Sequence, residues 1–389
     1  MRDELNAQTV PLSKAIDKVM ENFEEVSAYF IDKIAEQIKK IGQLRPTEIN
    51  RIVLMTEWGA DINDITARLA QAAAKSIPQV MMVYQQVIND TYADSRFTQA
   101  LKHTQLTPYD VARINQYAQA QSRQTAETII NLSNTTAVQE QYRNAVDKAV
   151  LAVSSGMTDY QSATRQVIRD LGYNGMQVQY QSGYHRRLDT ALRQNIVDGT
   201  NQLAQQASDI MGEALGYDAY EISAHAMSAP DHEPIQGRVF LKVEFERMQT
   251  GQPFSDIDGR QYEAIKRPVG EWNCKHFAMS FSTQFSKRKW TNEQLDDFAK
   301  KNAQGCEIDG KHYTTYGASQ LMRKTETQVR YEKDAAVAAK AAGDDILRQQ
   351  CQAKINSLMA TYYAIAKAAG LRTRPERTRV QGFKAIKVN

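Results

Sequence analysis

The sequence predicts a mainly α-helical fold: an N-terminal helical arm or bundle, a small loop-rich α+β module, and a C-terminal helical hairpin with a basic tail. Three observations predict it. Apolar residues recur every three to four positions through most of residues 1–216, which is the spacing of one helical face. Short segments of β-branched and aromatic residues between turn residues begin at Tyr217. Two long segments of strong helix formers follow from Tyr316.

The first predicted helix covers residues 12–41, where the apolar side chains share one face. A second helix begins at Pro46, because proline is tolerated in the first turn of a helix. We expect Gly59 to end it and Asp61 to cap a third helix. Pro78 is expected to kink or divide that third helix, because proline removes an interior hydrogen bond.

Further helices are predicted over residues 107–132, beginning at Thr-Pro, and over residues 137–153. Thr158 and Gln161 have the spacing of a capping box, so another helix should begin there. Gly172 then stands where a glycine commonly follows a helix end.

The last helix of this region is predicted over residues 187–215 and ends at Gly216. The pair Gly199-Thr200 is expected to interrupt it, because glycine is a poor helix former. No fixed-period repeat is present, which argues against a solenoid.

The central module is predicted to contain strands at residues 217–223 and 238–245. Residues 251–281 are rich in Gly, Pro, Asp and Asn and should be mostly loop. Within this segment, the sequence D-I-D-G at residues 256–259 resembles the start of an EF-hand calcium loop. The spacing to Glu263 does not match that of an EF-hand. We therefore expect a turn there.

The C-terminal region is predicted to form a helical hairpin. A helix over residues 316–342 should end at Gly343, and Asp344 or Asp345 should cap a second helix that Gly370 closes. These boundaries suggest four parts. They are a helical domain at 1–216, a module at 217–312, a hairpin at 313–370 and a tail at 371–389.

Composition limits the class of protein. The net charge is only +3, and no segment approaches the roughly 18 apolar residues that a membrane span requires. The first residues lack the basic and apolar regions of a signal peptide, so we expect the protein in a cytoplasm or in a particle assembled there. Three scattered cysteines do not form a disulfide framework.

The tail differs in charge from the rest of the chain. Six basic residues against Glu376 give residues 371–389 a charge of +5, which leaves −2 for the remainder. A basic arm can contact an anionic partner such as DNA, and it can equally be a solvated end. The candidate DNA contacts are Arg372, Arg374, Arg377, Arg379, Lys384 and Lys387.

Histidine and cysteine gather in two loops of the module. Both are zinc ligands, and four of them would close a tetrahedral site. The candidate ligands are His225, His232, Cys274 and His276. Their spacing does not match a common zinc finger, so these side chains could instead fasten a loop-rich region by hydrogen bonds.

Enzyme motifs are missing from the sequence. It contains no G-x-G-x-x-G after a strand, no G-x-x-x-x-G-K-[ST], no H-E-x-x-H and no G-x-S-x-G. Asp231 and His232 could act together as the general base of a hydrolase, but no recognisable nucleophile accompanies them. The pair Met81-Met82 is expected in a helix core.

Three segments carry a resemblance to a known family. The run EISAHAMSAPDHEPIQGRVF resembles the signature of the minor capsid protein family (minor capsid protein 2 type) of tailed phages, and WNCKH is similar to its G-x-N-C-[RK]-H. Residues 313–345 resemble its long helix, and ERTRV near Glu376 resembles its ending. The positions that follow the family's helical rhythm are Tyr316, Gln320, Arg323, Glu326, Val329 and Arg330.

This resemblance implies a structural protein of the phage head, distantly similar to Mu-F-like head-morphogenesis proteins. It implies contact with the portal, the major capsid protein or both, in multiple copies, with packaged DNA as a further partner. It implies assembly in the host cytoplasm, a final location in the virion, no required cofactor and no enzymatic activity. The alternatives are a metal-dependent hydrolase or nucleic-acid-modifying enzyme carried in the virion, and a scaffold-like protein that leaves the particle.

Overall fold

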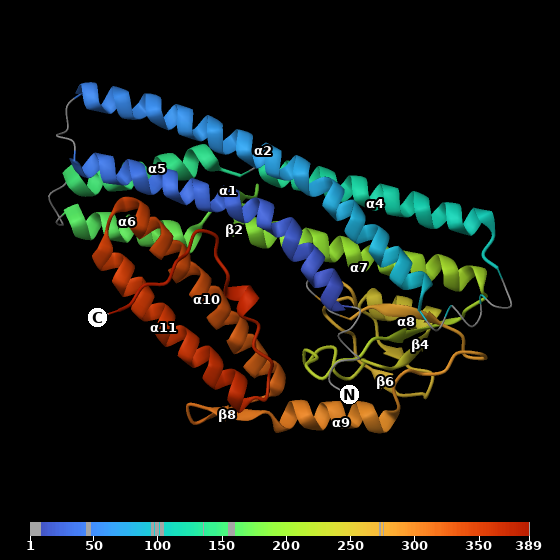
Figure 1. Cartoon of the computed structure of the whole chain (residues 1–389). Coiled ribbons are helices and arrows are strands. Elements are labelled where there is room, and N and C mark those ends of the chain that lie inside the picture. The colour runs from blue at the N-terminus through green and yellow to red at the C-terminus, as the bar shows by residue number, and fades with distance from the viewer. Residues whose placement is uncertain are drawn as a thin grey trace. The chain divides into compact units, whose positions relative to one another are not determined.

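The computed structural model describes residues 9–43, 48–94, 97, 101, 105–134, 136–154, 160–271, 274 and 276–388. It is mainly helical, as predicted (Figure 1). The chain forms two compact units, and each unit is built from three separate stretches of sequence. Unit 1 comprises Met1–Lys18, Ile77–Thr128 and Arg193–Gly317, and unit 2 comprises Val19–Ser76, Ile129–Leu192 and Ala318–Asn389. The boundaries at 216, 312 and 370 concern independent folding and stay predictions.

The predicted amphipathic helices are present. α1 buries the face that the sequence indicated, including Phe23, Phe30 and Ile34. Among the described residues up to Ala214, the helices are α1 (Thr9–Gln43), α2 (Glu48–Tyr92), α4 (Pro108–Asn134), α5 (Val138–Ser154), α6 (Tyr160–Asn174) and α7 (Leu188–Ala214).

α2 is one continuous helix, so the predicted stop at Gly59 and the cap at Asp61 are wrong. Asp61 instead accepts hydrogen bonds from the Tyr142 hydroxyl at 2.8 Å and from Gln37 at 3.0 Å. Gly59 lies exposed in the helix, where glycine costs only about 1 kcal/mol. Tertiary contacts of the surrounding residues therefore outweigh the weak propensity.

Pro78 also lies inside α2 and does not divide it. Val80 and Tyr84 are buried just beyond it, and their packing continues the helix. The boundary between the two units falls beside this proline, after Ser76. The expectation that Met81 belongs to the helix core is wrong, since it is 52% exposed, and its neighbour is exposed as well.

Two glycines expected to end or interrupt helices lie within them. Gly172 is inside α6, and a Cβ there would meet the backbone of Ala335 in α10 (Thr315–Ala342). The glycine that follows the end of α6 is Gly175, which has a φ of +55°. Thr158, half of the expected capping box, lies outside the described residues.

Gly199 makes room for a neighbouring helix. α7 runs through Gly199 without a break, and a Cβ there would collide with the Tyr84 hydroxyl. That hydroxyl is buried and lies 2.5 Å from the Thr125 hydroxyl of α4. The glycine thus allows a close approach of helices in unit 1 rather than a helix end.

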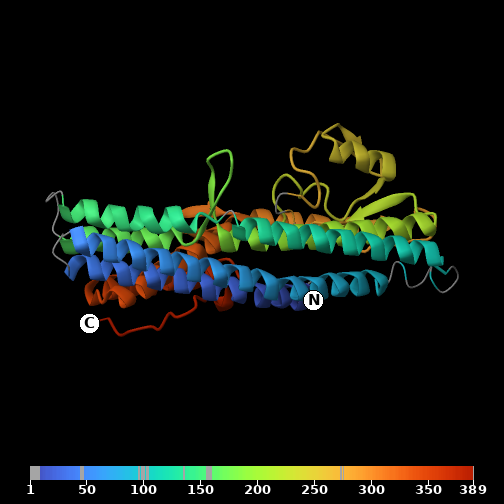
Figure 2. The ribbon, with the colours of Figure 1, turned by 90° about the horizontal axis from the view of Figure 1, so that it is seen from above.

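A β-hairpin that the sequence reasoning missed joins α6 to α7. β1 (Gln177–Gln179) pairs antiparallel with β2 (His185–Arg187), and Gly183 occupies the turn with a φ of +80°. Figure 2 shows this hairpin standing away from the helices of unit 2. Its strands are too short to produce a clear alternating pattern.

The module is organised by a three-stranded antiparallel sheet, in the order β4-β3-β7. Its strands are β3 (Ala219–Ile222), β4 (Val239–Leu241) and β7 (Ala278–Phe281). The predicted strand at 238–245 is correct only to Leu241, because α8 (Lys242–Gln249) begins at the next residue. The predicted D-I-D-G turn is confirmed, since Asp256 accepts bonds from the amides of Asp258 and Arg260.

The remaining small elements complete unit 1. Thr291 and Gln294 form a capping box at a helix that the sequence reasoning overlooked. These elements are β5 (Phe254–Ser255), β6 (Gln261–Tyr262), α9 (Asn292–Gln304), β8 (Cys306–Ile308) and β9 (Lys311–Tyr313).

The β7 edge is covered by α7. The outward-facing amide of Ala278 donates to Gln205 Oε1 at 3.1 Å, and that of Ser280 donates to Ser208 Oγ at 2.9 Å. The Ser280 hydroxyl also donates to the Ser208 carbonyl at 2.9 Å. An edge strand has unpaired backbone groups, and here helix side chains pair them, which fastens the sheet to α7.

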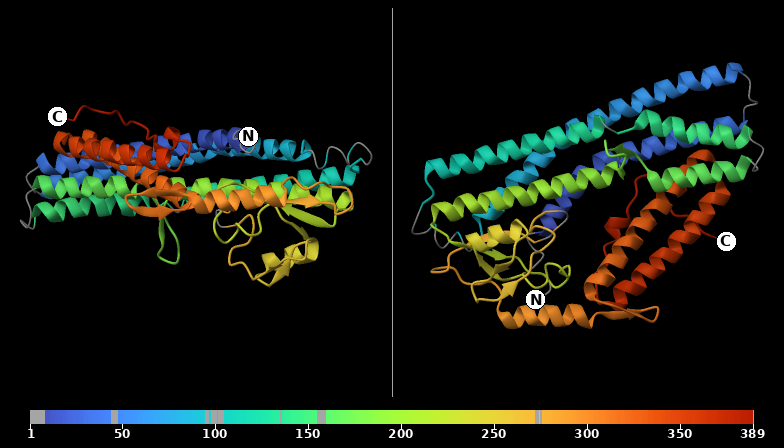
Figure 3. Two further views of the ribbon diagram at one scale, coloured as in Figure 1. Left: turned by 90° about the horizontal axis from the view of Figure 1, so that it is seen from below. Right: turned by 180° about the vertical axis from the view of Figure 1, so that it is seen from behind.

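The predicted C-terminal hairpin is confirmed. α10 ends at Gly343, and Asp344 caps α11 (Asp345–Ala368) by accepting from the Leu347 amide at 2.9 Å. Figure 3 shows α10 and α11 side by side. Among the described residues, no helix is both long enough and apolar enough to cross a membrane.

Candidate metal centre

The two loops that contain the histidines and the cysteine meet at one end of the three-stranded sheet. β3 ends at Ile222, which pairs with Ala278 at the start of β7. Glu221 pairs with Val239 at the start of β4. Because the pairing is antiparallel, the loop after β3 and the loop before β7 leave the sheet at the same end. The topology therefore brings residues 223–238 and 263–277 together.

His232 is positioned by a short helical turn. Its amide donates to the Ala229 carbonyl at 3.0 Å, and its own carbonyl accepts from the Gln236 amide at 3.1 Å. Gly237 follows with a φ of +65°, a conformation that glycine adopts without strain. Its amide donates to Ile222 at 2.9 Å, which returns the chain to the sheet.

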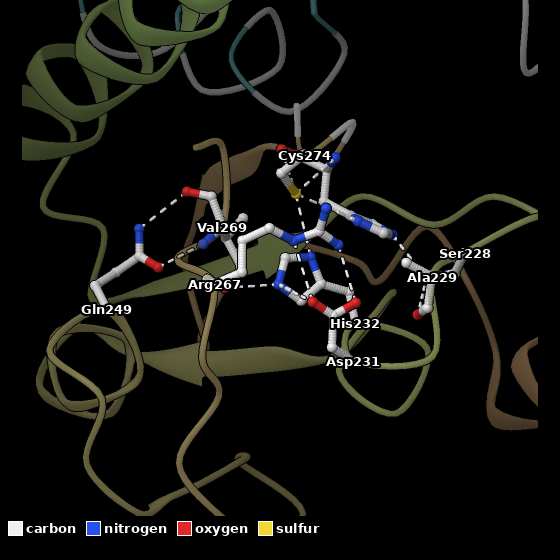
Figure 4. A network of polar contacts seen from close by, with 9 residues as sticks. Ser228, Ala229, Asp231, His232, Gln249, Arg267, Val269 and Cys274 are labelled. Carbon is white, nitrogen blue, oxygen red and sulfur yellow. Dashed lines mark hydrogen bonds and ion pairs between the residues drawn. The ribbon is translucent and has the colours of Figure 1, made fainter. Parts of the chain in front are cut away.

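The second loop is held by α8. The side-chain amide of Gln249 donates to the Val269 carbonyl at 3.0 Å and accepts from the Val269 amide at 2.7 Å. This two-bond pairing fixes the backbone ahead of Cys274 (Figure 4). Trp272, Asn273 and Lys275 lie outside the described residues.

Three side chains meet between the loops. The Cys274 sulfur lies 3.1 Å from His232 Nδ1 and 3.6 Å from His276 Nδ1. One ligand atom from each of the three lies within 4.8 Å of the others, and all three residues are buried. Among the described residues, these three could therefore hold a metal ion.

The far nitrogens of both imidazoles have partners of their own. His232 Nε2 lies 2.7 Å from the Arg267 carbonyl, and His276 Nε2 lies 3.3 Å from the Ser228 hydroxyl. A carbonyl only accepts hydrogen bonds, so His232 Nε2 carries the proton and Nδ1 presents its lone pair to Cys274. Arg267 is itself held by two hydrogen bonds to the Asp231 carboxylate, at 3.1 and 2.9 Å.

Burial favours the neutral forms of His232 and Cys274. It lowers the pKa of His232, because the imidazolium would be desolvated. It also raises the pKa of the Cys274 thiol, because a thiolate would be desolvated. The S–H group of the neutral thiol can then donate to His232 Nδ1, 3.1 Å away.

His225, the fourth candidate, takes a different position. Its ring stacks on His276 with centroids 4.5 Å apart and planes inclined by 20°. A stacked ring presents its face to its neighbour, while metal coordination uses the nitrogen lone pairs in the ring plane. The structure thus places the possible ligand atoms of three of the four candidates within 4.8 Å of one another and places His225 as a ring contact. Residue spacing alone does not reveal this difference.

Asp231 and His232, considered above as an acid–base pair, each contact Arg267. Asp231 lies 3.8 Å from His232 Nε2, but its oxygens bind the Arg267 guanidinium and that nitrogen faces the Arg267 carbonyl. The arrangement orients the imidazole toward Cys274.

The basic tail lies along the helical hairpin of unit 2. Lys333 donates to the Thr378 carbonyl at 2.7 Å, and the Ile386 amide donates to Gln352 at 3.1 Å. Of the candidate DNA contacts, Arg374 and Arg377 are half-buried. The exposed ones are Arg372, Arg379, Lys384 and Lys387.

A sequence model of the family described as phage minor capsid protein 2 matches residues 9–363. The chain belongs to this family. The match includes both loops of the candidate centre and the long α10 helix, and it confirms the resemblance noted in the sequence. This minor capsid protein is therefore a structural component of a phage virion. No curated protein and no solved structure matches the chain.

Proposed function

We propose that this minor capsid protein sits at the portal of the phage head and acts in head morphogenesis or in the packaging and ejection of DNA. The observation that carries the proposal is the family match over residues 9–363. A role beside the portal requires surfaces for other virion proteins and tolerance of packaged DNA. Unit 2 supplies a feature suited to each requirement.

The β1–β2 hairpin is suited to protein contact. Tyr184 at its tip is 63% exposed, and its ring lies 6.0 Å from that of Tyr180. Tyrosine is enriched in protein interfaces because it offers a rigid contact area at low entropic cost. Residues 171–188 contain no Asp or Glu, so the hairpin is suited to an uncharged or acidic surface. We infer that the hairpin contacts another head protein.

The exposed bases of the tail are suited to contact with DNA. Phosphate neutralisation needs positive side chains in solvent and no reading of bases. Arg372, Lys384 and Lys387 meet this condition. Arg379 is 70% exposed and lies 3.9 Å from Glu21, a distance at which a surface pair contributes little.

Cryo-electron microscopy of purified virions, with mass spectrometry of the same particles, tests the proposal. We expect density for the chain at the portal vertex, with the β1–β2 hairpin against a neighbouring protein. Density spread over the whole shell would contradict portal association. Absence of the chain from mature virions but presence in procapsids would instead indicate a scaffold-like protein.

A further inference from the structure

We propose that His232, Cys274 and His276 bind one zinc ion, which fastens the loop after β3 to the loop before β7. This site is independent of where the protein lies in the virion. The three side chains come from two loops about 40 residues apart, yet their ligand atoms all lie within 4.8 Å of one another. Fastening two long loops at one point is the task of a structural zinc site in a small module.

The distances are close to those that zinc requires. Zinc binds sulfur at about 2.3 Å and imidazole nitrogen at about 2.0–2.1 Å, so tetrahedral ligands stand about 3.4–3.6 Å apart. The Cys274 sulfur is 3.6 Å from His276 Nδ1, which agrees with this value. It is 3.1 Å from His232 Nδ1, so that pair would widen by about 0.5 Å around an ion.

The partners behind the ligands match those of a metal site. A metal-binding histidine commonly donates its other ring N–H to a carbonyl or another polar group, which fixes the tautomer. His232 does this with the Arg267 carbonyl at 2.7 Å. His276 makes the corresponding contact with Ser228. Both imidazoles therefore already present Nδ1 to the sulfur before an ion binds.

The donor set selects the kind of ion. One thiolate and two neutral imidazoles suit zinc, whereas magnesium and calcium prefer oxygen ligands. On binding, the zinc–sulfur bond replaces the S–H bond of Cys274, and the proton passes to solvent. No electron is transferred in this step.

The described residues supply three ligands, and tetrahedral zinc takes four, so in this proposal a water molecule supplies the fourth. The stacked His225 ring is a neighbour of that set. Three protein ligands with one exchangeable position predict weaker retention of zinc than a closed four-ligand finger.

Metal analysis of the full-length protein tests the proposal. After dialysis against a small excess of Zn²⁺ and gel filtration, we expect about one zinc per chain in the wild type. C274S should retain at least tenfold less zinc. C306S is the matched control, since Cys306 is a free cysteine in β8, and it should bind as the wild type does. Wild-type protein without zinc, or equal loss from both variants, would overturn the proposal.

Three further measurements separate binding from folding. Cobalt in place of zinc should give a thiolate-to-metal absorption band in the wild type, and that band should be absent in C274S. A chelator should lower the Tm of the wild type but not that of C274S. S228A should retain the fold and bind zinc roughly 10-fold more weakly, because its effect passes through His276. If the wild-type Tm does not change with metal and cobalt gives no thiolate band, the zinc site is contradicted. This outcome is separate from the location of the protein in the virion, which cryo-electron microscopy tests.

Discussion

The imidazole of His232 is fully buried, and burial lowers its pKa. In the unfolded chain, histidine takes up a proton near pH 6.5. Below that pH the unfolded state binds more protons than the folded state, so the free energy of unfolding falls as pH falls. We expect a loss of at most about 1 kcal/mol between pH 6.5 and pH 5.5 in urea melts with a chelator present. H232Q should flatten this dependence, and a wild-type profile as flat as that of H232Q would contradict it.

Gly199 provides a second test at the scale of one residue. G199A would gain about 1 kcal/mol of helix propensity but would push against the buried Tyr84 hydroxyl. Overpacking of this kind costs about 1–3 kcal/mol, so we expect net destabilisation. G59A is the matched control, because Gly59 is exposed in α2 with open space around it, and it should stabilise. Thermal melts of the two variants should move in opposite directions.

The sequence was informative about residue types and silent about their orientation. Histidine and cysteine in two loops were sufficient to nominate the candidate centre. Whether His225 faces the sulfur or stacks on His276 depends on ring orientation, which spacing does not encode. In the same way, a glycine at position 199 could break the helix or allow another helix to pack closely. The position of the Tyr84 hydroxyl beside it shows that it allows close packing.

At the scale of elements, the Ser280 amide at the β7 edge depends on one serine side chain of α7. S208A removes the acceptor for the Ser280 amide and leaves that buried group without its bond. The cost of a lost buried hydrogen bond is about 1–3 kcal/mol. Hydrogen exchange of the Ser280 amide should therefore accelerate roughly tenfold or more, since about 1.4 kcal/mol corresponds to tenfold. S357A, at an exposed position of α11, should leave that rate unchanged. An unchanged rate in S208A would show that the Ser208 hydroxyl does not protect the Ser280 amide.

Element boundaries were predicted well where an apolar face marks the helix, as in α1, or helix formers end at a glycine, as in α10. They were predicted poorly where packing decides. α2 continues through Gly59 because long-range contacts such as Asp61 with Tyr142 stabilise it. α8 replaces the second half of a predicted strand, although Val243 and Phe245 favour strand by propensity. The Thr291 capping box was present in the sequence and correctly marks α9.

At the scale of the whole molecule, charge predicts how the protein meets DNA. Replacing the exposed Arg372, Arg379, Lys384 and Lys387 with Gln should weaken non-specific DNA binding while keeping the packed backbone of the tail. Each lost phosphate contact should reduce the slope of log affinity against log salt by about 0.9. Lys300 and Lys354, which are exposed on α9 and α11, give control substitutions. An equal salt slope in wild-type and tail variants would show that the tail is a solvated end or a protein contact.

The division into two interleaved units could not be predicted from the sequence. Periodicity identifies helices one at a time, but it does not say which distant helices pack together. Gly172 packs against the backbone of Ala335, which is far away in the chain. Nothing in the sequence around either residue indicates this contact.

Interleaving also sets the order of events during synthesis. Val19–Ser76 belongs to the same compact unit as Ala318–Asn389, so its apolar faces have no complete partner until the last stretch is made. At roughly 5–20 residues per second, a ribosome needs about 12–48 s to travel from Ser76 to Ala318. During that interval the helices around Phe23 and Phe30 expose surfaces that aggregate readily in a crowded cell. We therefore expect a nascent chain of this design to benefit from chaperones or from early capture by the particle that it will join.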